Sequence, residues 1–219
     1  MARILNQSSG NVTLDINGDG SYTIPATSAD SLLLIYFLGG VTEPFVSTTD
    51  GNFTVSSRLA GASADRNIYI AYREHVAAGR TAISFTGGDA SGTLGVLYIE
   101  YFGLVSTSAA GSLGTWASNG QWTSASTGPV GNYASGLLVS LVFSEPSGDI
   151  LTGRDGSTHR LTFSPSGGHT LGIADKEITN VSGSYTTQGT ALTGGAQGDL
   201  FIFRTSAPIV DVLWARSAI

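Results

Sequence analysis

The chain of 219 residues contains no cysteine, and only 12% of its residues are charged. Without cysteine it can form neither disulfide bonds nor thiolate metal sites. Its share of charged residues is about half of that in an average globular protein. We therefore expect its stability to come from packing and from hydrogen bonds between strands.

Positive charge is scarce, because Lys176 is the only lysine, the arginines are scattered and the net charge is -6. Nucleic-acid binding needs clustered cations that contact phosphates, so we expect no nucleic acid among the partners. The longest apolar run, Leu32 to Leu38, is much shorter than the roughly 20 residues that a membrane-crossing helix needs. We therefore expect no membrane partner either.

The first residues, MARILNQSSGN, lack the apolar stretch of a secretory signal. We expect the protein to stay in the cytoplasm where it is made, or to leave by another route, such as inside a released particle. No domain-sized break in composition and no internal repeat is visible. The expected organisation is a hairpin extension over residues 1–29, one domain over residues 30–204 and a C-terminal arm over residues 205–219.

Helical periodicity is also almost absent, whereas glycine, with 30 residues, is abundant. Short runs rich in Ile, Val, Tyr, Phe and Thr are separated by Gly, Asn, Asp or Pro, as in sandwiches and barrels. The predicted fold is all-β, a single jelly-roll-like antiparallel β-sandwich. The expected strands cover residues 11–16, 21–25, 31–38, 52–57, 67–73, 80–86, 94–102, 136–143, 159–164, 178–187 and 199–204.

Alternation within these runs predicts which faces are buried. In residues 67–73 we expect Ile68 and Ile70 on the core face, and Tyr69 and Arg73 on the other face. Residues 94–102 are apolar on both faces, so both faces are expected to be covered. Glu100 lies within that run and is expected at a rim or beside a partner.

Residues 15–24, DINGDGSYTI, match the first half of a calcium-binding loop. Such a loop ends with a bidentate carboxylate at its twelfth position, and here that position is Ala26. Asn17-Gly18 and Asp19-Gly20 instead suit the positive φ angles of a tight hairpin turn. We predict a hairpin, with adventitious calcium binding as the alternative, and we expect no cofactor or metal.

The usual catalytic motifs are missing. We find no Gly-x-Ser-x-Gly, no phosphate-binding loop ending in Gly-Lys-Ser/Thr and no His-Glu-x-x-His. The histidines fit no zinc pattern and are expected on the surface, although His159, His169 and Asp175 could converge. Glycosidase chemistry needs two carboxyl groups about 5 to 9 Å apart, and the sequence does not rank its candidates. These candidates are Glu100, Asp175 and Glu177.

Residues 107–136 are nearly free of charge and carry Trp116, Trp122 and Tyr133. If Asn119-Gly120 forms a two-residue hairpin, Trp116 and Trp122 lie on opposite faces. If one strand runs through, the two tryptophans share a face and could stack on a sugar. Buried aromatic residues are the alternative, since tryptophan is highly buried on average.

Several segments are similar to a β-sandwich domain of bacteriophage virion proteins and some bacterial surface proteins. The most telling is a strand, then His75 to Gly79, then another strand, in which Val76 to Gly79 forms a corner between sheets. The similarity spans Ser31 to Arg204 and rests on DSLLLIYFL at 30–38, STTDGNFTV at 47–55, IYIAYREHVAAGRTAISFT at 68–86, VLYIEYFGL at 96–104 and ADKEITNVSGSYTTQGTAL at 174–192.

This resemblance implies a building or binding module without catalytic residues. We expect a non-enzymatic virion structural protein, a capsid decoration or cement subunit that binds copies of itself and the major capsid protein or another virion protein. The expected contact residues are Asn17 and Asp19 in the turn, and Ile209, Val212, Leu213 and Trp214 in the arm. The alternative is a tail or fibre module that binds host glycans through Trp116, Trp122 and Tyr133. A glycan-cleaving enzyme ranks last.

Overall fold

The computed structural model describes residues 3–40, 42–60, 67–110, 121–123, 130–144, 151–153, 156–165, 169–185, 188–191 and 196–205. All regular elements in these ranges are β-strands, and all their pairings are antiparallel. No helix in this part of the chain is long and apolar enough to cross a membrane. The prediction of an all-β antiparallel sandwich is confirmed.

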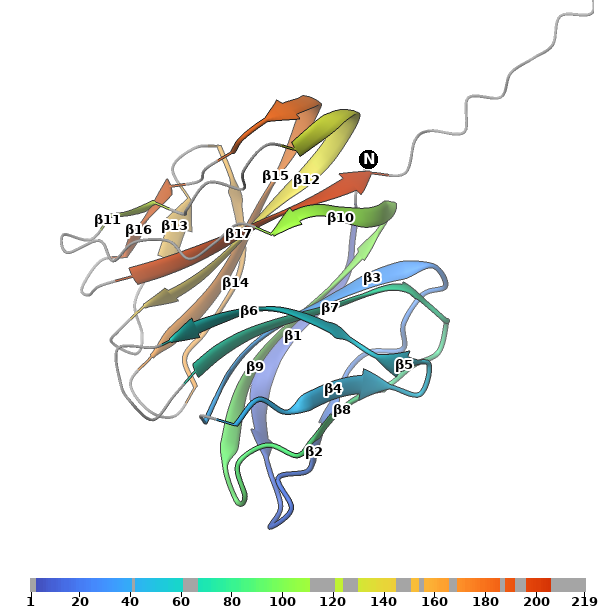
Figure 1. Cartoon of the computed structure of the whole chain (residues 1–219), viewed down its shortest axis with the longest axis vertical. Helices are drawn as coiled ribbons and strands as arrows, with labels where there is room; N and C mark the ends of the chain where they lie inside the picture. The colour runs from blue at the N-terminus through green and yellow to red at the C-terminus, as the bar shows by residue number, and fades with distance from the viewer. Residues whose placement is uncertain are drawn as a thin grey trace, which may run out of the picture.

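The strands form four sheets (Figure 1). The central sheet contains, in spatial order, β1 (Arg3–Thr13), β9 (Thr93–Phe102), β3 (Ser31–Gly39), β7 (Asn67–Val76) and β6 (Thr54–Ala60). The five-stranded outer sheet contains β10 (Leu104–Ala110), β17 (Ala196–Thr205), β12 (Val130–Ser144), β15 (Thr170–Gly183) and β14 (Thr158–Phe163).

Two smaller sheets complete the described part of the fold. The four-stranded outer sheet contains β2 (Gly20–Thr23), β8 (Ala82–Thr86), β4 (Phe45–Thr48) and β5 (Gly51–Asn52). The small sheet contains β11 (Gln121–Thr123), β16 (Gln188–Ala191) and β13 (Leu151–Gly153).

The central sheet is the middle of three layers, as Figure 1 shows. One of its faces packs on the five-stranded outer sheet, and the other packs on the four-stranded outer sheet. Every residue of β3 is buried as a result. Leu34 and Tyr36 enter the first core, which lies between the central sheet and the five-stranded outer sheet. Ile35 and Phe37 enter the second core, which lies between the central sheet and the four-stranded outer sheet. The uninterrupted apolar run of β3 thus reflects burial on both faces.

This layering explains one confirmed and one wrong prediction. The run 94–102 was expected to be covered on both faces, and β9 is buried from Leu94 to Tyr101. Tyr69 was expected on the face of β7 that is opposite the core, but Tyr69 is 0% exposed. Its ring stacks on Phe37 with 5.0 Å between the ring centroids.

The turn predicted near Asn17 is present. Asp15 Oδ1 accepts hydrogen bonds from the backbone N–H groups of Asn17 at 2.7 Å and Asp19 at 3.0 Å. These bonds hold the pKa of Asp15 below its ordinary value. Gly18 has a φ of 78°, and a Cβ there would lie 2.0 Å from the carbonyl oxygen of Gly88. The turn prediction is therefore confirmed, with glycine required at position 18.

The strands that flank this turn do not pair with each other, so the predicted hairpin is wrong in that respect. β1 pairs with β9, whereas β2 pairs with β8 in another sheet. The physical reason is that Val12 and Leu14 before the turn, and Tyr22 and Ile24 after it, are all buried in the second core. The segment from β1 to β2 therefore connects two layers of the sandwich.

The corner predicted at residues 76–79 is confirmed. It leads from β7 in the central sheet to β8 in the four-stranded outer sheet. Gly79 has a φ of 79°, and its N–H donates to the carbonyl oxygen of Thr27 at 2.8 Å. The Thr27 hydroxyl in turn donates to the carbonyl oxygen of Ala77 at 2.7 Å. The corner is thus fixed by the segment that leads into β3.

Candidate functional site

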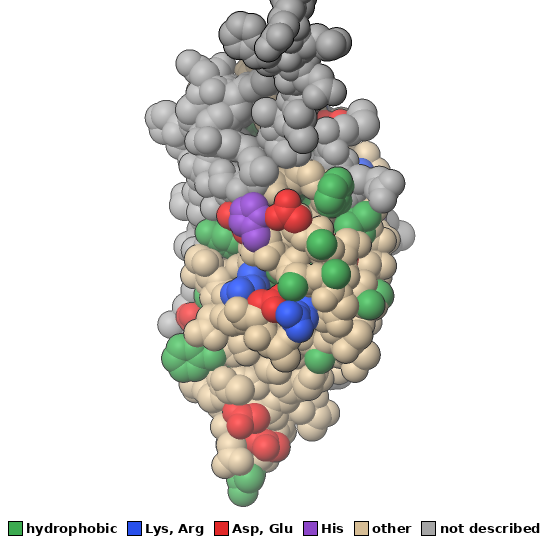
Figure 2. All heavy atoms as spheres, turned by 90° about the vertical axis from the view of Figure 1, so that its right-hand side faces the viewer, with side chains coloured by type: hydrophobic (Ala, Val, Ile, Leu, Met, Phe, Trp, Pro, Cys, Tyr) green, Lys and Arg blue, Asp and Glu red, His purple; other side chains and the backbone are tan. Residues whose placement is uncertain are grey.

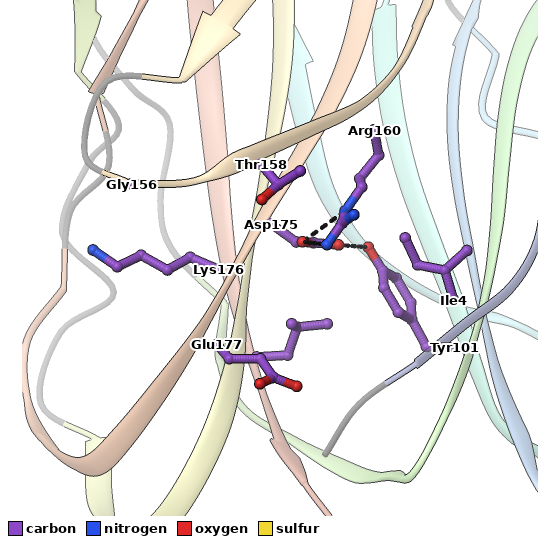
Figure 3. Close-up of a pocket in the computed structure, with 9 residues that line it drawn as sticks. Ile4, Tyr101, Gly156, Thr158, Arg160, Asp175, Lys176 and Glu177 are labelled. Atoms are coloured by element: carbon purple, nitrogen blue, oxygen red, sulfur yellow. Dashed lines mark hydrogen bonds and ion pairs between the residues drawn. The ribbon is translucent and has the colours of Figure 1, made fainter.

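A cleft of about 370 Å³ opens between the central sheet and the five-stranded outer sheet (Figure 3). Ile4 of β1 and Tyr101 of β9 line it from the central sheet. The outer sheet lines it with Leu137 of β12, Thr158 and Arg160 of β14, and Asp175 and Glu177 of β15. Side chains from five strands therefore meet at this position.

Asp175 is the buried charged group of the cleft, with only 2% of its surface exposed. It lies opposite Thr158, where β14 begins. The Nε and terminal nitrogen of Arg160 donate to Asp175 Oδ1 at 2.8 and 2.7 Å. The Tyr101 hydroxyl donates to Asp175 Oδ2 at 2.9 Å. Both carboxylate oxygens thus have partners, as a buried charge requires.

This arrangement also affects the other two groups. Burial, followed by the charge of Asp175, raises the pKa of Tyr101 well above its ordinary value. The hydrogen bonds to Asp175 raise the pKa of Arg160 as well. Tyr101 therefore acts as a hydrogen-bond donor, and Arg160 remains a cation.

Glu177 shares a face of β15 with Asp175, because residues two apart in a strand point the same way. Unlike Asp175, Glu177 is exposed. Both side chains line the cleft, and so does Lys176, although its side chain points away from the Arg160–Asp175 pair, as Figure 3 shows. The cleft thus combines a half-buried ion pair with the exposed carboxylate of Glu177 and the ammonium group of Lys176.

Glu100, the third candidate acid, lies elsewhere. It is 0% exposed, and it neighbours Tyr101, so the two side chains point to opposite faces of the central sheet. Its carboxylate accepts hydrogen bonds from Asn6 Nδ2 at 2.6 Å, from the Ser28 N–H at 2.7 Å and from the Tyr98 hydroxyl at 3.4 Å. Of the two expected placements, the partnered one is confirmed, and Glu100 cannot act together with Asp175.

The histidines do not form a metal site with Asp175. His159 lies opposite Ala174, one step along the ladder from Asp175, and its Nε2 lies 2.6 Å from the Thr162 hydroxyl. His169 is buried, with 5.0 Å between its ring centroid and that of Phe143, so its expected surface position is wrong. Among the described residues, no group of three or more His, Asp or Glu could hold a metal ion.

A second hollow, of about 330 Å³, lies beside β5 and the end of β7. Figure 2 shows that charged side chains of both signs gather on one face of the molecule. Arg80 forms an ion pair with Asp50, and this pair lowers the pKa of Asp50. Arg73, which lines the hollow, donates to the carbonyl oxygens of Asn52 at 2.6 Å and Asp50 at 2.7 Å. The two hydrogen bonds of Arg73 hold the turn at Asp50 to Asn52 against β7.

His75, at the same hollow, provides a test by pH. Its Nδ1 lies 2.5 Å from Asp30 Oδ1, and this contact raises the pKa of His75 above its ordinary 6.5. The ion pair therefore stabilises the folded chain below about pH 6.5, and its contribution disappears as the pH rises through the raised pKa. The contribution is small, because the two side chains are 60% and 70% exposed.

The measurement is an NMR titration of the His75 ring. We expect a midpoint above 6.5, and a lower midpoint in Asp30→Asn. Asp89→Asn serves as the control, since Asp89 bonds to the Thr42 N–H instead. An unchanged midpoint in Asp30→Asn would show that the ion pair does not form in solution.

Other residues named from the sequence stay untested as functional groups. Trp116, Ile209, Val212, Leu213 and Trp214 lie outside the described residues, and for Trp122 and Tyr133 only the backbone is described. Asn17 and Asp19 are exposed in the turn beside Ile16, which is 80% exposed. No family model, no curated protein and no solved structure matches the chain.

Sequence reasoning named Asp175 and Glu177 but missed the residues that complete the cleft. Tyr101 and Arg160 were treated only as members of the expected strands 94–102 and 159–164. Arg160 and Tyr101 are 15 and 74 positions from Asp175 in the chain. The only signal in the sequence was the charge of Asp175 within a strand, because a buried charge needs a partner of opposite charge or a hydrogen-bond donor.

Proposed function

We propose that this chain is a non-enzymatic structural protein of a bacteriophage virion, of the capsid decoration or cement type. In this proposal it is made in the host cytoplasm and assembles as an oligomer on the head surface. Its partners are copies of itself and the major capsid protein or another virion protein. The resemblance of its strand and corner segments to virion sandwich domains supports this setting and the jelly-roll relationship.

The observation that carries the proposal is the open edge of the central sheet. Among the described strands, β1 pairs only with β9, so its other side has no strand partner. From Asn6 to Thr13 its register is regular, and this stretch contains no charge, proline or bulge. Proteins usually protect a long edge with such features, because its backbone groups can pair with another chain. β1 is therefore suited to accept a strand from a neighbour.

The strand that we assign to this edge is residues 207–219 of a neighbouring copy. Their sequence, APIVDVLWARSAI, alternates as a strand does and is about as long as β1. The last described residue, Thr205, pairs with Leu104. Phe102, two residues before Leu104, pairs with Arg3 at the start of β1. If residues 207–219 continued from Thr205 along β1 of the same chain, they would run parallel to β1. A segment from a neighbour can instead pair antiparallel, as all described strands do.

The positions of the three candidate acids also support a role without catalysis. A glycosidase needs one carboxyl group in apolar surroundings and a second one nearby. Asp175 is held by Arg160, Glu177 is exposed, and Glu100 lies on the other face of the central sheet. Each of these acids therefore has a structural or solvent-facing position.

The proposal is tested by deleting residues 207–219 and, separately, by the edge variant Ser9→Lys/Asn11→Lys. Both changes should convert the oligomer to monomer in size-exclusion chromatography with light scattering, because a lysine pair hinders strand addition. Ser21→Lys/Thr23→Lys, on the short edge strand β2, is the matched control and should leave the oligomer intact.

The virion setting is tested with the same proteins and purified phage heads. The parent chain should co-sediment with the heads, whereas the truncated chain should stay in the supernatant. Circular dichroism should show that the truncated chain is still folded. Normal oligomers and normal head binding by the truncated chain would contradict the proposal.

A further inference from the structure

The cleft beside Asp175 retains hydrogen-bonding capacity after its internal contacts are made. Arg160 carries five N–H donors, and only two of its nitrogens donate to Asp175. Its side chain is 35% exposed, so the remaining donors can reach a ligand in the cleft. Thr158 and Glu177 add a hydroxyl and a carboxylate to the same opening.

The lining also has an apolar part. Ile4 and the ring of Tyr101 contribute to it from the central sheet, and Leu137 contributes from β12, where it lies opposite Glu177 in the outer sheet. A ligand held here would place one face on apolar carbon atoms and its edge on polar groups. Saccharides have this character, because their C–H faces are apolar and their hydroxyl groups both donate and accept.

The charges of the cleft argue against an ionic ligand. Arg160 and Asp175 neutralise each other through hydrogen bonds of 2.7 and 2.8 Å. Lys176 also lines the cleft, but its side chain points away from this pair, so a phosphate or carboxylate would have to compete with Asp175 for Arg160 and would meet Glu177 as well. A cationic ligand would meet Arg160. A neutral ligand gains the hydrogen bonds without breaking this pair.

We propose that the cleft is a binding site for a neutral saccharide of one or two rings. Its volume of about 370 Å³ lies at the small end of ligand sites. In this site Arg160 donates to ring or hydroxyl oxygens, and Glu177 accepts from hydroxyl groups. The site is distinct from the aromatic platform of Trp116, Trp122 and Tyr133 suggested by the sequence, and it does not depend on the proposed assembly through β1.

The test is an NMR titration of the isotope-labelled chain with glucose, galactose, N-acetylglucosamine, maltose and lactose. Weak sites have dissociation constants on the order of millimolar, so each sugar is added to about 50 mM. We expect saturable shifts of the Arg160 Nε–H signal and of the Thr158 and Glu177 amides with at least one sugar. Inorganic phosphate and glycine, added in the same way, should not produce them.

Three variants identify the site. Glu177→Gln and Thr158→Val should each weaken binding by about 3-fold to 10-fold, because the first replaces one acceptor oxygen and the negative charge with a donating NH2 group and the second removes a hydroxyl. Arg160→Lys should weaken it by about 10-fold or more, since lysine keeps the charge but loses the planar donor array. Glu74→Gln in the second hollow is the matched control and should bind as the parent does.

Several results would overturn the proposal. These are no shift with any of the five sugars, shifts that do not saturate, or shifts caused by phosphate or glycine instead. Unchanged affinity in both Glu177→Gln and Thr158→Val would also overturn it. Glu177 and Thr158 are exposed, so these two variants should fold even if Arg160→Lys does not.

Discussion

Phe37→Ala is expected to lower the free energy of unfolding by about 4 kcal/mol, and Tyr36→Ala by a similar amount. The two neighbouring side chains point to opposite faces of β3, and both are 0% exposed. Phe37 contacts Tyr69 and Phe85, with ring centroids 5.0 and 5.4 Å away. Tyr36 belongs to the other core, against the five-stranded outer sheet. Each substitution therefore leaves a cavity in a different core.

Urea unfolding of the parent and both variants measures this effect. Phe102→Ala serves as the control, because Phe102 is 47% exposed, and it should cost less than about 1 kcal/mol. In a sandwich of only two layers, one of two neighbouring residues on a strand faces solvent. A small effect of either Tyr36→Ala or Phe37→Ala would therefore contradict the central position of this sheet.

Arg160→Ala should be the most damaging change in the cleft, at about 3 kcal/mol, because it leaves the buried Asp175 carboxylate without its cation. Asp175→Ala should lower the free energy of unfolding by less, since the Arg160 charge left behind is 35% exposed and can be hydrated. The double variant Arg160→Met/Asp175→Leu removes both charges. It should be more stable than Arg160→Ala, because no uncompensated charge remains.

Thermal and urea unfolding of the three variants provide the comparison. If Arg160→Ala is as stable as the parent, Asp175 does not depend on this ion pair. If the double variant is the least stable of the three, the packing of these side chains outweighs their charge.

The strands could be predicted from the sequence where their apolar residues are dense. The runs 31–38 and 94–102 match β3 and β9 closely, because burial on both faces leaves them almost without polar residues. β15 was expected at residues 178–187 but covers Thr170–Gly183. Its polar residues Asp175 and Lys176 interrupt the apolar pattern, although Asp175 is buried beside Arg160.

The assignment of strands to sheets could not be predicted. The turn at Asn17 has hairpin residues, yet local turn chemistry does not decide whether the flanking strands pair. The layering decided it here, because Val12 and Tyr22 both enter the second core from different sheets. For the same reason Tyr69 was expected on the face opposite the core, although it stacks on Phe37 in the second core.

The candidate site was predictable only in part. The spacing of Asp175 and Glu177 places both on one face of a strand, and both line the cleft. Because Glu100 directly precedes Tyr101 in a strand, the sequence predicts only that their side chains lie on opposite faces of the sheet. The residues that reach Asp175 depend on the register of β14 in the same sheet and of β9 in the facing sheet, and no local pattern specifies these registers.

The central sheet connects the fold with the proposed function. Burial on both faces fixes β9 and β3 firmly, so β1 is held on a rigid neighbour along Asn6 to Thr13. Asn6 is further tied to the buried Glu100 at 2.6 Å. A rigid edge loses little entropy when a strand is added, which favours assembly.

Hydrogen exchange of the β1 amides tests the central claim most directly. In dilute monomer, the amides of residues 6–13 that face away from β9 should exchange rapidly, and those bonded to β9 slowly. In the assembled oligomer, or on phage heads, the outward-facing amides should become protected as well. Outward-facing amides that exchange equally fast in monomer and assembly would show that β1 is not the assembly edge.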